Sequence, residues 1–182
     1  GQSSNCVFNP LQTVNYIRDE MRNWILWYKK QVGFSGVRLD AIKHFPTYIA
    51  EDYLWNLQHG NGWANATDDM FAVGEWVGGA SELDQWCNDV QNRAGTFDFS
   101  LRSALVGIVQ GNGAFDLGSI PNNQQLNRQR TVPFVNNHDT FRPILDSDGN
   151  YNGWNSSQQL GTQIEPNDPR LSVVYAISFA LD

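Results

Sequence analysis

The sequence is poor in the features that identify several common classes of protein. It has only two cysteines, Cys6 and Cys87, which are equally compatible with one disulfide and with two buried thiols. No apolar run approaches the length needed to span a membrane. Basic residues number 12 against 19 acidic ones, and the net charge of -7 argues against nucleic acid or an anionic membrane as a partner.

The sequence does contain enough apolar material for one core. Hydrophobic residues make up 41% of the 182 residues and charged residues 17%, a balance that excludes a disordered chain. This length suits one globular core better than two domains. Seven Trp, six Tyr and ten Phe residues are many for such a chain. Aromatic faces stack on sugar rings, although most aromatic residues simply pack in a core.

Apolar periodicity predicts short buried strands that alternate with helices. Helices are expected at 10–32, 45–57, 81–93, 101–110 and from 169 onward, strands at 36–39, 70–73, 96–99 and 131–135, and polar loops at 60–69 and 142–169. Strands that are apolar on both faces and alternate with helices indicate a parallel α/β architecture, either a doubly wound sheet or a β/α barrel. The sequence has no glycine-rich phosphate fingerprint, which weakens the dinucleotide-binding form of the doubly wound sheet.

Three carboxylates follow three of these strands. Asp40 and Glu75 come directly after strands, and Asp139 lies just past a third. Because the carboxyl ends of parallel strands meet on one face, the three acids are expected to converge there, where β/α-barrel enzymes build their sites. This placement favours the barrel over the doubly wound sheet.

Two carboxylates on neighbouring strands suit the cleavage of a glycosidic bond. One acid protonates the leaving oxygen, and a second carboxylate roughly 5 Å away attacks the sugar with retention of configuration. Arg38 lies two residues before Asp40, so a strand points both side chains the same way, and the cation favours an ionised nucleophile. Glu75 lies between Gly74 and Trp76, where burial would raise its pKa and suit it to donate a proton.

Three segments resemble the motifs of the α-amylase family, glycoside hydrolase family thirteen. Gly36-Val37-Arg38-Leu39-Asp40-Ala41-Ile42-Lys43-His44 is similar to the nucleophile motif, Gly74-Glu75-Trp76 to the acid/base motif, and Phe134-Val135-Asn136-Asn137-His138-Asp139 to the third-carboxylate motif. Their order and rough spacing also match. Asn136 departs from the pattern, because many members have an acid at that position.

The resemblance implies retaining hydrolysis of α-1,4-glucosidic bonds in starch-like α-glucans. Asp40 would be the nucleophile, Glu75 the general acid/base, and Asp139 the carboxylate that distorts the substrate and stabilises the transition state. Arg38 and His138 would bind the sugar at the cleavage point or orient the acids.

Three further residues are expected to bind substrate, two of them on the leaving-group side. Lys43 and His44 would line the leaving-group side, and Trp76 is expected to be a substrate-binding residue. The backbone carbonyl of His44 would also serve as a ligand to the calcium ion that many members carry.

The resemblance further implies that residues 1–182 are a fragment of the catalytic domain, with no second domain. Thr96-Phe97-Asp98-Phe99 resembles the sixth strand, so the chain would run from about the fourth strand to the seventh helix of a (β/α)8 TIM barrel. Both ends have the character of a cut chain, and no third-strand motif precedes Asp40. The fragment alone is therefore expected to be inactive, and the full-length enzyme to be a secreted monomer.

Other functions stay open at this point. An oligosaccharide α-glucosidase or a transglycosylase would use the same carboxylates. A non-catalytic carbohydrate-binding homologue is disfavoured because all three acids are present, and a sugar-phosphate barrel enzyme lacks its glycine-rich phosphate loop. The segment Asp146 to Asn150 hints at a calcium loop, but it lacks the later bidentate Glu, so a plain turn is the better interpretation.

Overall fold

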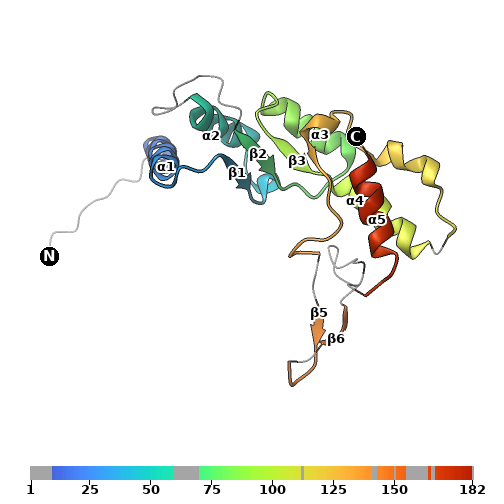
Figure 1. The fold of residues 1–182 in the computed structure, drawn as a ribbon. Helices are drawn as coiled ribbons and strands as arrows, with labels where there is room; N and C mark the ends of the chain where they lie inside the picture. The colour runs from blue at the N-terminus through green and yellow to red at the C-terminus, as the bar shows by residue number, and fades with distance from the viewer. Residues whose placement is uncertain are drawn as a thin grey trace.

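A computed structural model describes residues 10–59, 70–111, 113–140, 143–149, 151–154, 164 and 167–181 (Figure 1). In chain order the elements are α1 (Pro10–Val32), β1 (Gly36–Leu39), the 3-10 helix η1 (Ile42–His44), α2 (Thr47–His59), β2 (Phe71–Gly74), α3 (Ala80–Asp89), β3 (Gly95–Phe97), α4 (Phe99–Gln110), the 3-10 helices η2 (Leu117–Asn123) and η3 (Arg128–Arg130), β4 (Thr131–Val132), β5 (Pro143–Leu145), β6 (Tyr151–Trp154) and α5 (Leu171–Ala180). Among the described helices, none has the length and apolar character needed to cross a membrane.

The sheet confirms the parallel α/β architecture. Its four strands are ordered β1-β2-β3-β4, and every neighbouring pair is parallel. Each strand is followed by helical structure before the next strand begins, as parallel pairing requires. In register, Leu39 lies opposite Gly74, so β1 and β2 end side by side.

The long helix α1 begins and ends as its sequence predicts. Pro10 is its first residue, a position where the missing N–H costs nothing. Gly33 ends the helix with φ of 71° and donates its N–H to the Lys29 carbonyl at 2.7 Å. The helix packs on α2 through a two-pronged ion pair, in which the Arg22 guanidinium donates to both carboxylate oxygens of Asp52 at 2.6 Å.

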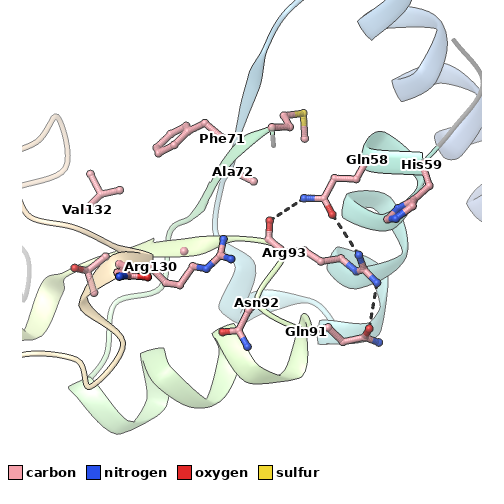
Figure 2. Close-up of a pocket in the computed structure, with 13 residues that line it drawn as sticks. Gln58, His59, Phe71, Ala72, Gln91, Asn92, Arg93, Arg130 and Val132 are labelled. Atoms are coloured by element: carbon pink, nitrogen blue, oxygen red, sulfur yellow. Dashed lines mark hydrogen bonds between the residues drawn. The ribbon is translucent and has the colours of Figure 1, made fainter. Parts of the chain in front are cut away.

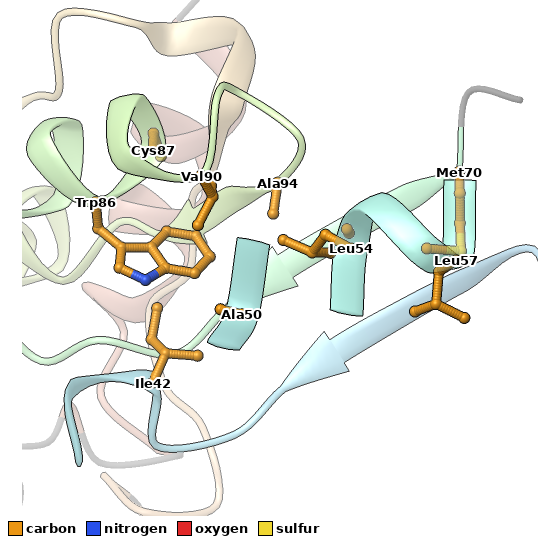
Figure 3. Packing of buried hydrophobic residues seen from close by; sticks show 10 residues of the cluster. Ile42, Ala50, Leu54, Leu57, Met70, Trp86, Cys87, Val90 and Ala94 are labelled. Atoms are coloured by element: carbon orange, nitrogen blue, oxygen red, sulfur yellow. The ribbon is translucent and has the colours of Figure 1, made fainter. Parts of the chain in front are cut away.

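Buried side chains form two clusters on the helical side of the sheet. The first joins β1 and β2 to α2 and α3 and is shown in Figure 3; its members are Ile42, Ala50, Leu54, Leu57, Met70, Ala72, Trp86, Cys87, Val90 and Ala94. The second joins α4 to α5 and η2; its members are Leu101, Leu105, Val106, Val109, Ile120, Val135, Ile164 and Val174. The first cluster fills the space directly behind the ends of β1 and β2.

Several predicted boundaries are wrong, and each error has a local cause. The helix expected at 81–93 ends at Asp89, because Gln91 and Asn92 take positive φ angles of 56° and 55°. The strand expected at 96–99 ends at Phe97, because Asp98 caps α4 by accepting the Leu101 N–H at 2.8 Å. The helices expected at 45–57 and 101–110 are shifted by two residues at their starts.

The later part of the chain departs further from prediction. The strand expected at 131–135 pairs only over β4, two residues long. The loop expected at 142–169 contains the antiparallel hairpin of β5 and β6. Its turn includes Gly149, at φ of 81°, and an Asp146 side chain that accepts the Asp148 N–H at 3.0 Å. The expected loop at 60–69 lies outside the described residues, as does Cys6.

Candidate active site

Backbone hydrogen bonds hold the two leading carboxylates at neighbouring strand ends. The Glu75 N–H donates to the Leu39 carbonyl at 2.9 Å, which extends the pairing of β1 and β2 by one bond. The Ile42 N–H then donates to the Glu75 carbonyl at 3.1 Å. Asp40 therefore lies between Leu39 and Ile42, which are both hydrogen-bonded to the backbone of Glu75. These two bonds fix the positions of the Asp40 and Glu75 backbones relative to each other.

A sharp turn follows Asp40. Ala41 takes the left-handed conformation, with φ of 50° and ψ of 38°, which is costly for a residue with a Cβ. The turn starts η1 and drives Ile42 into the first cluster, where its side chain is fully buried. Gly74 makes room for it: a Cβ there would lie 2.5 Å from Ile42 Cδ1 and 2.7 Å from Trp86 Cη2. Buried packing thus sustains the strained turn that aims Asp40 away from the core.

One guanidinium nitrogen of Arg38 contacts both carboxylates. Arg38 Nη2 lies 2.8 Å from Asp40 Oδ1 and 2.9 Å from Glu75 Oε2. The two oxygens are therefore no farther apart than the sum of these two distances. This upper limit is shorter than the roughly 6.5–9.5 Å that separates the carboxyl groups of inverting glycosidases. The Arg38 guanidinium also lies 5.9 Å from the centre of the Phe97 ring, which helps to hold the cation in place.

The two acids differ in their surroundings. The Glu75 side chain is only 11% exposed, whereas that of Asp40 is 68% exposed. Burial raises the pKa of Glu75 above its ordinary value, and the hydrogen bond with Asp40 raises it further, while the Arg38 cation and the Ala41 N–H partly oppose the rise. A carboxyl group with a raised pKa keeps its proton to higher pH. Glu75 is therefore the better proton donor of the pair.

The third segment meets the first at a cleft of about 390 Å³. Arg38 lines it from β1, and Asn136, Asn137 and His138 line it from the chain beyond β4. Asp139 joins this edge through its neighbour, because its Oδ2 lies 3.2 Å from His138 Nε2. The Asn137 side chain shapes the turn here by accepting the N–H groups of Asp139 and Thr140 at 3.0 and 2.8 Å.

The remaining residues predicted for the site fall into two groups. Lys43 and Trp76 come together: Lys43 Nζ lies 5.7 Å from the centre of the Trp76 ring and donates to the Val77 carbonyl at 3.3 Å. His44 is exposed at the end of η1, with its N–H donating to the Ala41 carbonyl at 2.9 Å. The described residues include no group of three or more His, Cys, Asp or Glu side chains placed to hold a metal ion.

A separate pocket, of about 500 Å³, lies at the other end of the strands (Figure 2). It is lined by Phe71, Gly95 and Thr131, the first residues of β2, β3 and β4. Figure 2 shows the Arg93 side chain bonded to Gln58 and Gln91, and its Nε also donates to Glu51 at 3.2 Å. Because Asp40 and Glu75 follow the opposite strand ends, this pocket is separate from their chemistry.

Two kinds of residue near the site escaped sequence reasoning. Phe97 and Phe134 line the cleft with Arg38 and pack edge to face, with ring centres 5.8 Å apart. Their position at or just past a strand end was the available signal, but sequence alone does not show which side chains meet the cleft. Asp98, which also follows a strand, is buried as the cap of α4 and belongs to the scaffold.

Comparison with known proteins gives relatives over two thirds of the chain, although no family model matches it. A glucan 1,4-alpha-maltohexaosidase from Bacillus sp. strain 707 is 29% identical over 125 residues, which are 67% of this chain and 23% of that protein. An alpha-amylase from Geobacillus stearothermophilus is 29% identical over 124 residues, 66% of this chain and 22% of the relative. A cyclomaltodextrin glucanotransferase from Niallia circulans is 28% identical over 136 residues, which are 70% of this chain and 17% of that protein.

The chain thus matches less than a quarter of the length of each of these proteins. The relatives also include one amylase named as cytoplasmic and one named as chloroplastic, so similarity to these proteins does not determine the cellular compartment of this one.

Proposed function

We propose that this chain, whose relatives confirm its resemblance to the α-amylase family, carries the catalytic carboxylates of a retaining enzyme that hydrolyses α-1,4-glucosidic bonds in starch-like α-glucans. The observation that carries the proposal is the contact of Asp40 and Glu75 with one nitrogen of Arg38 at two paired strand ends. Inverting enzymes keep their carboxyl groups roughly 6.5–9.5 Å apart to admit a water molecule, so this closer pair suits retention.

The roles follow from exposure and protonation. Asp40, the more exposed acid, attacks the anomeric carbon and forms a covalent glycosyl ester. Glu75, whose pKa is raised, gives its proton to the leaving glycosidic oxygen. Glu75 then takes a proton from water, which cleaves the ester and restores Asp40. Arg38 positions both carboxyl groups throughout, since it contacts each of them.

The substrate-binding roles are proposals of the same kind. Arg38 and His138 line the cleft at the cleavage point, beside Asp139, which would stabilise positive charge on the sugar. Trp76 and Lys43 pack together next to Glu75 and would meet the leaving group, with His44 exposed beyond them. Sugar hydroxyls suit such donors, and the net charge of -7 does not repel a neutral glucan.

The remaining expectations also stand as proposals. The parallel sheet with its crossover helices is the expected middle of a (β/α)8 barrel, with residues 1–182 forming one part of a monomeric, secreted enzyme. For calcium, the backbone carbonyl of His44 is the one ligand the sequence suggests, and the described acids and histidines form no cluster around it. Raising calcium should increase the melting temperature of the complete enzyme if the site exists.

A second candidate is a transglycosylase that uses the same two carboxylates. The similarity to cyclomaltodextrin glucanotransferases favours it, because those relatives are named for transfer rather than hydrolysis. The two functions differ in whether water or a sugar hydroxyl breaks the glycosyl ester. Analysis of the products from a single maltooligosaccharide separates them: hydrolysis gives only shorter chains, whereas transfer also gives longer or cyclic ones.

Glu75→Gln in the complete enzyme tests the proposal, because it keeps the size of the side chain and removes the transferable proton. Turnover should fall at least 100-fold while maltooligosaccharide binding stays within about threefold. Glu20→Gln, on an exposed part of α1, is the matched control and should leave both unchanged. The first product formed by the parent enzyme should be the α-anomer by NMR. A β-anomer, or a Glu75→Gln variant that keeps its turnover, contradicts the assignment.

A further inference from the structure

The pocket at the first residues of β2, β3 and β4 has a positively charged lining. Its volume, about 500 Å³, lies within the range of binding sites for small molecules. The described residues that line it include Arg93, Arg130 and His59, but no Asp or Glu. The whole chain, by contrast, carries a net charge of -7. A positive lining in an acidic protein attracts anions to this one place.

Hydrogen bonds hold the Arg93 side chain in one position on the pocket wall. Its Nη1 donates to Gln58 at 3.3 Å and its Nη2 to Gln91 at 3.1 Å, as Figure 2 shows. Its Nε donates to the Glu51 carboxylate at 3.2 Å, and this ion pair balances the charge of Arg93. These bonds use three of the five N–H donors of a guanidinium. Arg93 therefore offers the pocket oriented N–H groups rather than net charge.

Arg130 supplies the net positive charge. It is the last residue of η3, it is exposed, and it forms no ion pair with any acid that the structure describes. Its backbone is fixed, because its N–H donates to the Asn127 carbonyl at 3.0 Å and its own carbonyl oxygen lies against Gly95, where a Cβ would overlap it. The first residue of β3 thus anchors the backbone from which this uncompensated guanidinium extends.

The other polar groups of the lining suit a ligand that carries hydroxyl groups. Four of them are side-chain amides, which both donate and accept hydrogen bonds: Gln58, Gln91, Asn92 and Gln129. Guanidinium groups bind the oxygens of phosphate and carboxylate through parallel N–H bonds. A bare phosphate or carboxylate group would leave most of the 500 Å³ unfilled and the amides without partners. The lining therefore selects an anion with a larger hydroxylated body.

We propose that this pocket binds a small hydroxylated anion, of the class of sugar phosphates and sugar acids, with Arg130 and Arg93 on its anionic oxygens and the amides on its hydroxyl groups. The site goes beyond the proposed function, because it lies at the opposite strand ends from Asp40 and Glu75 and takes a charged ligand rather than a neutral glucan. Phosphate and carboxylate share the chemistry that the arginines recognise, and the experiment distinguishes them.

Calorimetric titration of the complete enzyme with glucose 6-phosphate, gluconate and glucose tests the proposal. At least one of the two anions should bind at least about tenfold more tightly than glucose, since a charge-assisted hydrogen bond accounts for such a difference. The tighter of the two anions identifies the group that the arginines hold. Binding of neither anion, or equal binding of glucose, would overturn the proposal. Turnover is not measured, so the result is independent of whether the enzyme cleaves α-glucans.

Arg130→Gln locates the bound anion. It removes the uncompensated charge from an exposed side chain, so the melting temperature of the unliganded enzyme should stay unchanged while affinity for the anion falls about tenfold or more. Arg128→Gln is the matched control: it removes the same charge from an exposed position on η3, outside the pocket, and should bind as the parent enzyme does. Equal affinities of the two variants would place the anion elsewhere and reject the site.

Discussion

One added methyl group behind Glu75 tests how the core supports the candidate site. In Gly74→Ala, the new Cβ would lie 2.5 Å from Ile42 Cδ1 and 2.7 Å from Trp86 Cη2. Both partners are almost fully buried, at 0% and 1% exposure, so neither can move outward into solvent. Real carbon atoms do not approach so closely, and the side chains or the strand must shift. We expect the variant to lose about 1–3 kcal/mol of unfolding free energy, the usual cost of overpacking.

A compensating change shows whether this particular contact is responsible. Ile42→Val removes the Cδ1 atom that the new methyl group would strike, and alone it should cost about 0.5–1.5 kcal/mol. In the double variant the two costs should not add, because the smaller side chain leaves room for the alanine. The contact with Trp86 stays, so the rescue should be partial.

Denaturant unfolding of the complete enzyme measures these free energies. Gly79→Ala is the matched control, because a Cβ at residue 79 has no atom within 4 Å and its φ of -79° suits alanine. Its cost, from the weaker helix cap, should stay below about 1 kcal/mol. Activity should fall in Gly74→Ala beyond the loss of folded protein, since the strand end that carries Glu75 must shift. Additive costs for Gly74 and Ile42, or a Gly74→Ala variant as stable as its control, would refute this account of the packing.

Three further predictions test other parts of the structure. Arg38→Met removes the cation that lowers the pKa of Glu75, so that pKa should rise. The alkaline limb of the pH profile of kcat/KM should then move to higher pH, with lower activity throughout. A limb that stays in place or moves to lower pH contradicts the contact. Asp84→Leu removes the carboxylate that accepts the Leu126 N–H at 2.9 Å and should cost about 1–3 kcal/mol in thermal unfolding, whereas a stability equal to that of the parent rejects this anchor. Burial raises the pKa of the Cys87 thiol to about 11. In a Cys6→Ser variant, which leaves Cys87 as the one thiol in the sequence, a thiol reagent at pH 8 should therefore modify Cys87 only after unfolding. Rapid labelling of the native variant would show instead that the Cys87 thiol is accessible.

The sequence by itself determined the order of helices and strands as far as β4 and the strand ends that carry the acids. The predicted strands at 36–39 and 70–73 are mostly apolar, and a parallel sheet covered by helices is the arrangement that buries such strands. Once consecutive strands were recognised, Asp40 and Glu75 had to follow neighbouring carboxyl ends. This inference needed only local patterns, because hydrophobic periodicity is a property of each segment.

Element boundaries required the tertiary structure, because apolar character reports burial rather than backbone pairing. Val135 was assigned to a strand for its apolar side chain, yet it is buried against α4 and α5 while the ladder stops at Val132. Asp98 could equally have been a fourth catalytic candidate. Only its hydrogen bond to the first turn of α4 showed that it is part of the scaffold.

Contacts between side chains that are distant in sequence were also decided by the fold. Arg38 was expected to act on Asp40, its neighbour on one strand, but the register of β1 against β2 brings Glu75 to the same nitrogen. The cleft that Arg38 and His138 line from two separate segments is of the same kind. Both arrangements depend on how separate segments pack in three dimensions, and no pattern within one segment determines the distance between side chains of different segments.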